Sequence, residues 1–438
     1  MTRVSLSQAI RSPVVILRFQ YSQSITYLRF YMLAKFNSKS GLFFIFLTVV
    51  LDSIGLGIII PVMPALIKEL IHGDISQASS YGGWLTFCYA FMQFFFAAVL
   101  GNLSDRYGRR PVLLCSLFGF AINYLLIGFA PTIFWLFVGR IVAGITGASH
   151  TVAAAYIADV STPQNKAQNF GLLGAAFGLG FIIGPVLGGL LGHYGPRVPF
   201  YAAAGLTFFN FLYGYFLVPE SLKPENRRAF SWKNANPIGS FRHIGRYVHI
   251  QPLVICIFLI NIAAHAVQST WSYYTMERFQ WNERMIGYSL GFIGVLLTIV
   301  QAGLIRIIIP KLGIPKSITF GILLSSISFL TMAFAGSNLM LYFSSFLYVF
   351  SGIAGPAIQS SISNQTPANE QGQIQGGLTC IISLTAIIGP LMMTSLFSFF
   401  TKKSTVLYLP GAPFYLASIL GLIAAIIAMQ YFRNHRQD

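Results

Sequence analysis

Charged side chains are scarce in this chain. Only 39 of its 438 residues are Lys, Arg, Asp or Glu, or 9%, whereas soluble globular domains carry about 25%. So little charge excludes a soluble globular protein of this length, and a hydrophobic content of 55% excludes a disordered chain. Acids are scarcest, with 11 against 28 basic residues and a formal net charge of +17. Because long apolar runs fill the chain, the basic residues indicate a membrane surface as the partner rather than nucleic acid.

Cysteine is equally sparse. Cys88, Cys115, Cys256 and Cys380 each lie in an apolar run, without a C-x-x-C pair or a nearby histidine. We expect them to be small buried hydrophobic residues. The sequence therefore predicts no metal site, no cofactor and no redox chemistry.

Apolar stretches long enough to cross a bilayer dominate the remaining sequence. They predict an all-α polytopic membrane protein with twelve transmembrane helices, separated mostly by short polar loops. The predicted spans are 42–62, 81–100, 112–130, 132–155, 168–192, 198–218, 251–275, 286–309, 316–334, 338–360, 373–398 and 411–432.

The distribution of Lys and Arg orients these spans. With the amino terminus inside, the inside segments hold 21 basic residues, the outside loops hold 6, and Arg140 lies within a span. Because cytoplasmic loops carry the excess of Lys and Arg, both termini are predicted to be cytoplasmic.

The predicted organisation has five parts. Residues 1–41 form a basic extension with six Lys or Arg and no acid, which is typical of a transit peptide or follows from an upstream start codon, with Met32 as the second candidate start. A six-helix bundle over 42–218 is followed by a cytoplasmic linker, 219–250. A second six-helix bundle spans 251–432, and 433–438 is a cytoplasmic tail.

An offset of 205 residues aligns features of the two predicted bundles. Gly108 falls on Gly313, Gly171 on Gly376, and Gly184-Pro185 on Gly389-Pro390. With an even number of spans per half, such a repeat has its axis along the membrane normal. Two facing bundles of this kind indicate a transporter, with the substrate site near mid-membrane between them.

The strongest local motif is GNLSDRYGRR, residues 101–110, between the second and third spans. Four charges are packed into a tight turn, where Gly108 supplies backbone freedom and the arginines face the cytoplasm. This loop resembles the signature loop of the major facilitator superfamily.

Three further segments resemble the drug/proton antiporter branch, and more closely the tetracycline efflux proteins. They are LDSIGLGIIIPVMP at 51–64, GRIVAGITGA at 139–148 and GAAFGLGFIIGPVLGG at 174–189. The resemblance covers 42–432 and is denser in the first half. It implies a proton-coupled exporter of the bacterial inner membrane that works by alternating access of two rocking bundles. We expect it to function as a monomer.

Two charged residues lie deep within apolar spans. Asp52 is the only acid so placed and Arg140 the only basic residue. Intramembrane charges are costly and default to functional sites. We predict that Asp52 binds and releases a proton, although it could instead satisfy a helix kink. The resemblance links Arg140 to proton coupling, and Asp52 is its candidate electrostatic partner.

Four residues are predicted to form a cytoplasmic gate. Asp105, Arg109 and Arg110 belong to the signature loop, and Asp159 follows the fourth span. In relatives the acid at the position of Asp159 pairs with loop arginines and closes the cytoplasmic side. The alternative is that Asp159 is a solvated acid.

The fifth span carries a glycine stripe that leaves one helix face nearly bare. Small residues allow close helix packing, and a proline inside the helix allows bending. The resemblance gives the same role to this packing motif, which comprises Gly174, Gly178, Gly180, Gly184, Pro185 and Gly188.

Polar residues within apolar spans are candidates for the substrate cavity. Asn261, His265 and Gln268 recur at i, i+4 and i+7 on the seventh span, so they form one stripe that we expect to face a cavity; hydrogen bonds between helices are the alternative. The other candidates are Gln93, Asn123, Gln301 and Gln359.

The sequence departs from the tetracycline exporters at three polar positions. Asn123 replaces an acid in the third span, Leu297 replaces a histidine and Ser325 replaces an acid. These changes disfavour a metal–tetracycline chelate as the substrate through that set of ligands.

We therefore predict a proton-coupled exporter of a small amphipathic molecule, a drug or tetracycline-like compound. One alternative is a transporter of the same fold for a metabolite such as a siderophore or peptide. Others are a membrane-embedded enzyme, for which the sequence shows no catalytic cluster, and a transport-inactive sensor.

Overall fold

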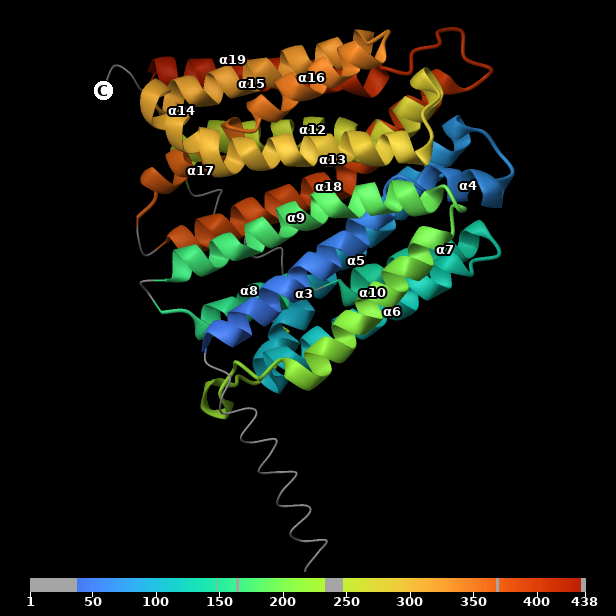
Figure 1. The fold of residues 1–438 in the computed structure, drawn as a ribbon. Helices are drawn as coiled ribbons and strands as arrows, with labels where there is room; N and C mark the ends of the chain where they lie inside the picture. Colours follow the sequence, from blue (N-terminus) through green and yellow to red (C-terminus); the bar gives the residue numbers. More distant parts are fainter. Residues whose placement is uncertain (1–37, 148, 163–164, 233–246, 368–369, 435–438) are drawn as a thin grey trace, which may run out of the picture.

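The computed structural model is built from helices and describes residues 38–147, 149–162, 165–232, 247–367 and 370–434 (Figure 1). Residues 1–37 of the predicted extension, 233–246 of the predicted linker and 435–438 of the predicted tail lie outside the described residues. We call residues 42–218 the first half and 251–432 the second half.

The first half contains two spans that are interrupted partway. Helix α3 bends by 44° into α4, and α7 ends at Thr146, shortly before α8 begins at Ser149. The helices are α3 (Ser38–Ile58), α4 (Met63–Ile71), α5 (Ile75–Tyr107), α6 (Arg109–Gly128), α7 (Ile133–Thr146), α8 (Ser149–Val160), α9 (Lys166–Gly192) and α10 (Val198–Leu217).

The second half also has interrupted spans. A π-helical segment, η4 (Val300–Leu304), separates α13 (Glu283–Ile299) from α14 (Ile305–Leu312). The remaining helices are α12 (Gln251–Phe279), α15 (Ile314–Phe334), α16 (Asn338–Ser351), α17 (Ala354–Asn364), α18 (Gln371–Thr401) and α19 (Ala412–Asn434). Two short 3₁₀ helices, η1 (Pro224–Asn226) and η3 (Val248–Ile250), lie between the two halves in the sequence.

The described helices confirm a multi-pass helical membrane protein. Ten are long and apolar enough to cross a membrane, and the bent pair Leu42–Ile58 and Met63–Ile71 makes an eleventh. The predicted span 286–309 corresponds to α13, η4 and α14, but only 17 residues precede its π-helical break. It therefore falls short of the length of a regular span.

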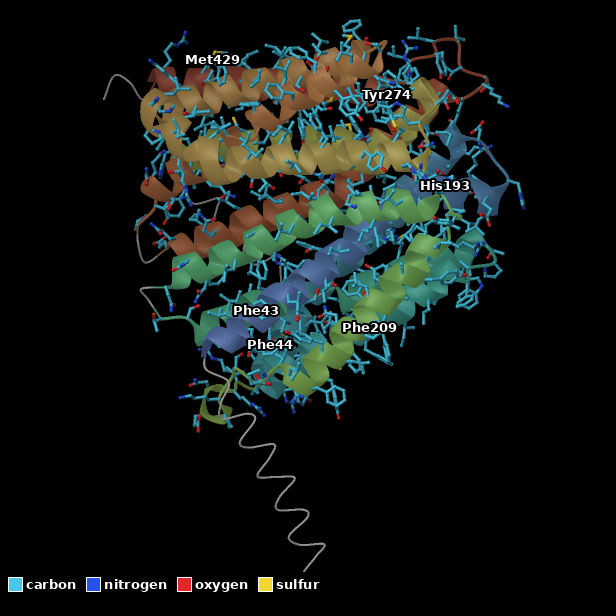
Figure 2. All side chains as sticks on the ribbon, in the orientation of Figure 1. Phe43, Phe44, His193, Phe209, Tyr274 and Met429 are labelled. Atoms are coloured by element: carbon cyan, nitrogen blue, oxygen red, sulfur yellow. The ribbon has the colours of Figure 1, made fainter. Side chains whose placement is uncertain are left out.

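Aromatic side chains cover the outside as well as the interior. Phe43 is 60% exposed whereas its neighbour Phe44 is 6% exposed, and Phe209 is 70% exposed (Figure 2). A soluble protein rarely exposes contiguous apolar surface of this extent. The exposed rings are suited to contact with lipid.

The repeat seen in the sequence has a counterpart in the backbone. Gly108 joins α5 to α6 with φ of 107° and ψ of 159°, and Gly313 joins α14 to α15 with φ of 76° and the same ψ. Both φ values favour glycine. Gly184-Pro185 lies inside α9, and Gly389-Pro390 lies inside α18.

The two halves lie side by side in Figure 1, the first in blue to green and the second in yellow to red. Within the first half α3 packs on α9 and α10, and α6 packs on α10. Between the halves α9 packs on α13, and α5 packs on α18 and α12.

The contacts between the halves are concentrated toward one end of the molecule. In the described part of the chain, the side-chain hydrogen bonds that join the halves all lie near the α4–α5 loop. In these bonds the hydroxyl of Ser76 donates to Ser398, that of Ser79 donates to Thr394, and that of Ser272 donates to Ile60.

The opposite ends of the same helices are open. A Cβ atom placed on Gly171 or Gly174 of α9, or on Gly372 of α18, would meet no atom within 4 Å. The hydrogen bonds between the halves therefore lie at the α4–α5 end, whereas these glycines of α9 and α18 face open space at the other end.

Candidate functional site

Asp52 lies in the interior of α3 and is 8% exposed. Its Oδ2 accepts a 2.5 Å hydrogen bond from the Ser149 hydroxyl of α8, and its Oδ1 is buried without a hydrogen-bond partner in the protein. Ser149 follows the break between α7 and α8, so the interruption of this span brings a donor to the carboxylate. One oxygen of Asp52 remains available to a proton or to water.

Arg140 lies on α7, and it does not pair with Asp52. In the described chain no carboxylate lies within 4.0 Å of its guanidinium, and its buried Nε has no partner. Tyr89 and Tyr124 interact electrostatically with both Asp52 and Arg140. Two tyrosines of α5 and α6 therefore share the surroundings of the two charges, and the expected direct ion pair does not form.

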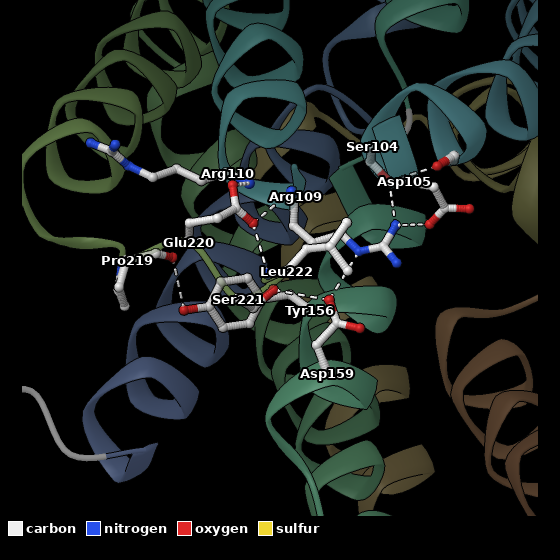
Figure 3. A network of polar contacts seen from close by, with 11 residues as sticks. Ser104, Asp105, Arg109, Arg110, Tyr156, Asp159, Pro219, Glu220, Ser221 and Leu222 are labelled. Atoms are coloured by element: carbon white, nitrogen blue, oxygen red, sulfur yellow. Dashed lines mark hydrogen bonds and ion pairs between the residues drawn. The ribbon is translucent and has the colours of Figure 1, made fainter. Parts of the chain in front are cut away.

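The predicted gate residues of the 101–110 loop do come together with α8 (Figure 3). The Arg109 guanidinium forms ion pairs with Asp105, at 2.5 Å, and with Asp159, at 3.0 Å. It also donates to the Ser104 hydroxyl at 2.6 Å. Arg109 is only 8% exposed, so the acids compensate a nearly buried charge. All these groups belong to the first half.

Arg110 lies apart from this ion-pair network. Its guanidinium donates to the backbone carbonyl of Tyr215 at the end of α10 and lies over the Tyr215 ring, 5.8 Å from the ring centre. The two adjacent arginines therefore connect α6 to different helices, and only Arg109 contacts the gate acids.

Glu220 is a functional candidate that the sequence analysis missed. Its carboxylate accepts hydrogen bonds from the backbone N–H groups of Arg109, at 2.9 Å, and Arg110, at 3.2 Å (Figure 3). These groups begin α6, where a carboxylate is favoured by the helix dipole. A Cβ on Gly108 would lie 2.3 Å from Glu220 Oε2, so glycine is also required there by the approach of this carboxylate.

The segment after α10 continues this contact. Ser221 Oγ donates to Asp159 Oδ2 at 3.0 Å, and Tyr156 of α8 donates to the carbonyl of Pro219 at 3.1 Å. The beginning of the linker is thereby bound to both the 101–110 loop and α8. Only the prolines and six basic residues of the linker, which are common in loops, marked this segment in the sequence.

The glycines of α9 fall on two contact surfaces. Gly180, Gly184 and Gly188 pack against α3, where their added Cβ atoms would meet Ser53, Gly57 and Ile58 at 2.2, 2.8 and 2.0 Å. By contrast, Gly178 would meet only Thr298 of α13, at 3.7 Å, and Gly174 would meet nothing within 4 Å.

Gly189, next to the stripe, faces the second half. Its Cβ would lie 3.0 Å from the Cα of Gly287 in α13, and the carbonyl of Pro185 approaches the same Gly287. Helix α9 therefore contacts the Asp52 helix on one face and the opposite half on another.

Two of the predicted cavity residues belong to the interior of the first half. Gln93 donates to the Tyr89 hydroxyl at 2.9 Å and to the carbonyl of Gly147 at 3.1 Å, so it satisfies the backbone at the break between α7 and α8. Asn123 is 1% exposed, and its unpartnered Oδ1 faces Gly139 of α7.

The three polar residues of the α12 stripe have different surroundings. His265 is 9% exposed, and its ring fills the space left by Gly389 of α18 within the second half. Asn261 donates to the carbonyl of Ile257 on its own helix at 2.8 Å, and Gln268 is exposed. Exposed positions are also taken by two other candidates, Gln301 and Gln359.

Two hollows lie at the ends of the molecule rather than at its centre. One, of about 960 Å³, lies near the α4–α5 loop and is lined by residues of both halves, among them Asp74 and Glu277. The other, of about 540 Å³, is lined by Asp105, Arg109 and Asp159 together with the beginning of the linker. Among the described residues, no group of His, Cys, Asp or Glu is arranged to hold a metal.

The model of the Major Facilitator Superfamily matches residues 45–316 and 304–438. The chain belongs to this superfamily. It is 40% identical over 389 residues to the class C tetracycline resistance protein of Escherichia coli, covering 88% of this chain and 97% of that protein. It is also 26% identical over 366 residues to multidrug resistance protein 2 of Bacillus subtilis, covering 82% and 90%.

The fold agrees with solved structures of the superfamily. The nucleoside transporter NupG matches with a TM-score of 0.73 at 13% identity, covering 90% of this chain and 99% of that one. This facilitator chain is therefore a transporter homologous to tetracycline efflux proteins, and the enzyme alternative is wrong.

Arg109→Ala is expected to destabilise this facilitator transporter. Its guanidinium is nearly buried, but the acids that it leaves behind, Asp105 and Asp159, are 40% and 20% exposed, so solvent screens them and we expect a loss of about 1 kcal/mol in the free energy of unfolding. Thermal unfolding of the purified protein, followed by tryptophan fluorescence, measures the change. Arg106→Ala is the matched control, because Arg106 is exposed and lies only over the Tyr107 ring. Equal midpoints for the two variants would contradict a stabilising network.

Proposed function

We propose that this transporter exports a small amphipathic molecule in exchange for protons, and that Asp52 carries the proton. The observation that supports this most directly is the Asp52 carboxylate, buried in a membrane-spanning helix with one hydroxyl donor and one unpartnered oxygen. An ionised carboxylate in such surroundings is costly. Protonation removes the charge, so proton binding and release at this residue change the stability of the surrounding helices.

The asymmetric contacts between the halves support alternating access. In the orientation indicated by the basic loops, the hydrogen-bonded α4–α5 end lies outside and the open end lies in the cytoplasm. We infer on this basis that the structure represents an inward-open state. The Arg109 network, held within the first half and bound to the linker, lies at the mouth of that opening, where we assign it the cytoplasmic gate.

Cellular placement follows from the same features. We assign the protein to the bacterial inner membrane as a monomer with both termini in the cytoplasm. Among the described residues, the exposed aromatic surface (Figure 2) is suited to contact with the lipid bilayer. The partners are then the bilayer, the small-molecule substrate and protons.

Tetracycline is the first substrate to test, because the relatives include tetracycline and multidrug resistance proteins. Asn123, Leu297 and Ser325 at polar positions of the exporters argue against recognition of the metal chelate through those groups. A metabolite such as a siderophore or peptide is the alternative substrate for the same fold.

Inverted membrane vesicles provide the test of function. Antibiotics including tetracycline, dyes and metabolites are screened for accumulation driven by an imposed pH gradient, beside vesicles without the protein. We expect at least one amphipathic compound to accumulate and to be released when an ionophore dissipates the gradient. Accumulation that persists without a proton gradient would contradict proton coupling.

A further inference from the structure

In the part of the chain that the structure describes, buried side-chain polar atoms without partners are found only in the first half. Nine side-chain nitrogen or oxygen atoms in the described chain are buried and make no hydrogen bond, and all nine come from residues 48–210. Buried hydroxyl groups of the second half, such as Thr275 and Ser326, instead donate to carbonyls of their own helices. Unpartnered buried groups are uncommon in folded proteins and call for an explanation.

Five of these atoms form one group around Asp52. They belong to Thr48 and Asp52 of α3, Tyr124 of α6, and Thr207 and Asn210 of α10. Thr48 and Asp52 are spaced i, i+4, and Thr207 and Asn210 i, i+3, so each pair lies on one helix face. We call these five residues the α3–α6–α10 cluster.

Contacts across the helices hold the cluster together. A Cβ atom on Gly55 would lie 3.3 Å from the Tyr124 hydroxyl and 3.4 Å from Thr207 Oγ1. Asn210 Nδ2 donates to the carbonyl of Thr48 at 3.1 Å, and Tyr124 interacts electrostatically with Asp52. The absence of a side chain at Gly55 thus leaves room for hydroxyl groups from two other helices.

The cluster is sealed from bulk solvent. Asp52 is its most exposed member at 8%, and Asn210 is fully buried. Leaving such atoms unsatisfied costs about 1–3 kcal/mol each, whereas buried water commonly satisfies groups of this kind. Threonine and tyrosine hydroxyls can both donate and accept hydrogen bonds. This property is required of hydrogen-bonded groups that pass protons from one to the next.

The cluster extends from Asp52 toward the end of the molecule that holds the 101–110 loop. On α3 Thr48 lies about 6 Å closer to that end than Asp52, at 1.5 Å per residue. On α10, which runs toward the same end, Asn210 lies beyond Thr207. Only six residues then separate Asn210 from the last residue of α10, Leu217.

We propose that the α3–α6–α10 cluster holds water and conducts protons between Asp52 and the cytoplasm, inside the first bundle and apart from the substrate path between the halves. The proposal rests on the proposed proton coupling at Asp52. A proton leaves the Asp52 carboxyl group for water, and each hydroxyl or water accepts one proton as it donates another. Ser149 donates to Oδ2 of Asp52, so the proton is exchanged at the unpartnered Oδ1. Because this route is separate from the space between the halves, protons can be exchanged while substrate occupies that space.

A pH-jump experiment on the purified full-length protein tests this route without a substrate. Time-resolved infrared spectroscopy follows the carboxyl band, and the part of the band that is lost in Asp52→Asn identifies Asp52. We expect Thr207→Val and Asn210→Leu each to slow the protonation of Asp52 by about tenfold. A tenfold change corresponds to an activation free energy that is higher by about the contribution of one hydrogen bond. The final amplitude should stay unchanged.

Thr385→Val is the matched control. Thr385 is also buried, but its hydroxyl donates to the carbonyl of Ile382 at 2.6 Å in the second half, so the wild-type rate is expected. Thr207→Ser, which keeps the hydroxyl, should restore the rate. If Thr207→Val does not fold, Thr48→Val and Asn210→Leu make the same comparison.

Wild-type protonation rates in the folded valine and leucine variants would overturn the route. Transport distinguishes this failure from that of the proposed function. If Asp52→Asn still accumulates substrate against its gradient, proton coupling at Asp52 fails. If that variant loses accumulation while the cluster variants protonate Asp52 normally, only the internal route fails.

Discussion

Asp52→Asn is expected to reduce proton-driven accumulation of substrate to the level of vesicles without the protein. Asparagine has nearly the same volume as aspartate, and its side-chain carbonyl can still accept the hydrogen bond from Ser149. The helix packing should therefore survive, while the group that binds the proton is lost. Accumulation under an imposed pH gradient measures the effect, and exchange of substrate across vesicles without a gradient should continue.

Asp74→Asn is the control for this substitution. Asp74 caps the start of α5, where its carboxylate accepts from the backbone N–H of Gln77 at 2.9 Å. Asparagine caps helices about as well as aspartate, so this variant should accumulate substrate normally. Asp52→Glu, which keeps a carboxyl group, should retain part of the activity. Undiminished accumulation by Asp52→Asn would exclude Asp52 as the proton carrier.

Helix α9 offers a physical connection between Asp52 and the surface between the halves. Gly180 lies against Ser53, the neighbour of Asp52, while Gly189 lies against Gly287 of the second half. With backbone packed on backbone at both contacts, a shift of α3 has no flexible side chain to absorb it. A change in the charge of Asp52 can therefore be transmitted to the interface through α9.

The helical, multi-pass architecture was predictable from the sequence because hydropathy and charge determine what a bilayer accepts. The breaks within spans were not. Gly147 is followed by the polar residues Ser149-His150-Thr151, and Val300 by Gln301 and Gly303. Residues of these types also occur inside unbroken membrane helices, so composition alone does not give the break that presents Ser149 or the π-helical segment. The twelve predicted spans exceed the ten or eleven regular ones because α13 ends at the π-helical segment after 17 residues, and because α3 and α4 count as a span only as a bent pair.

The site was predictable to different degrees. Asp52 was identified because an acid is conspicuous among apolar residues, whereas Glu220 was not, since an acid in a polar loop is ordinary. The stripe containing His265 was recognised by its spacing. Its direction was not, because helices of a membrane protein are apolar toward both lipid and neighbouring helices, and only the space beside Gly389 decides where the ring lies.

Gly188→Ala is expected to abolish transport and to lower stability strongly. The added Cβ would lie 2.0 Å from the carbonyl oxygen of Ile58 and 2.7 Å from its carbonyl carbon. Both atoms belong to the α3 backbone, so α3 and α9 must separate before the methyl group fits. Overpacking of this kind costs about 3 kcal/mol, and the separation also breaks the packing at Gly184 and Gly180, beside Asp52.

Gly174→Ala supplies a control on the same helix. Its Cβ would meet no atom within 4 Å, and alanine is favoured over glycine in a helix by about 1 kcal/mol. The thermal midpoint of purified Gly174→Ala should therefore equal or exceed that of the wild type, and transport should continue. Because both variants make the same chemical change in α9, a lower midpoint and lost transport in Gly188→Ala alone would assign the effect to the α3 contact. Equal behaviour of the two would show that α3 and α9 can separate without cost, and the connection from Asp52 to the interface would then fail.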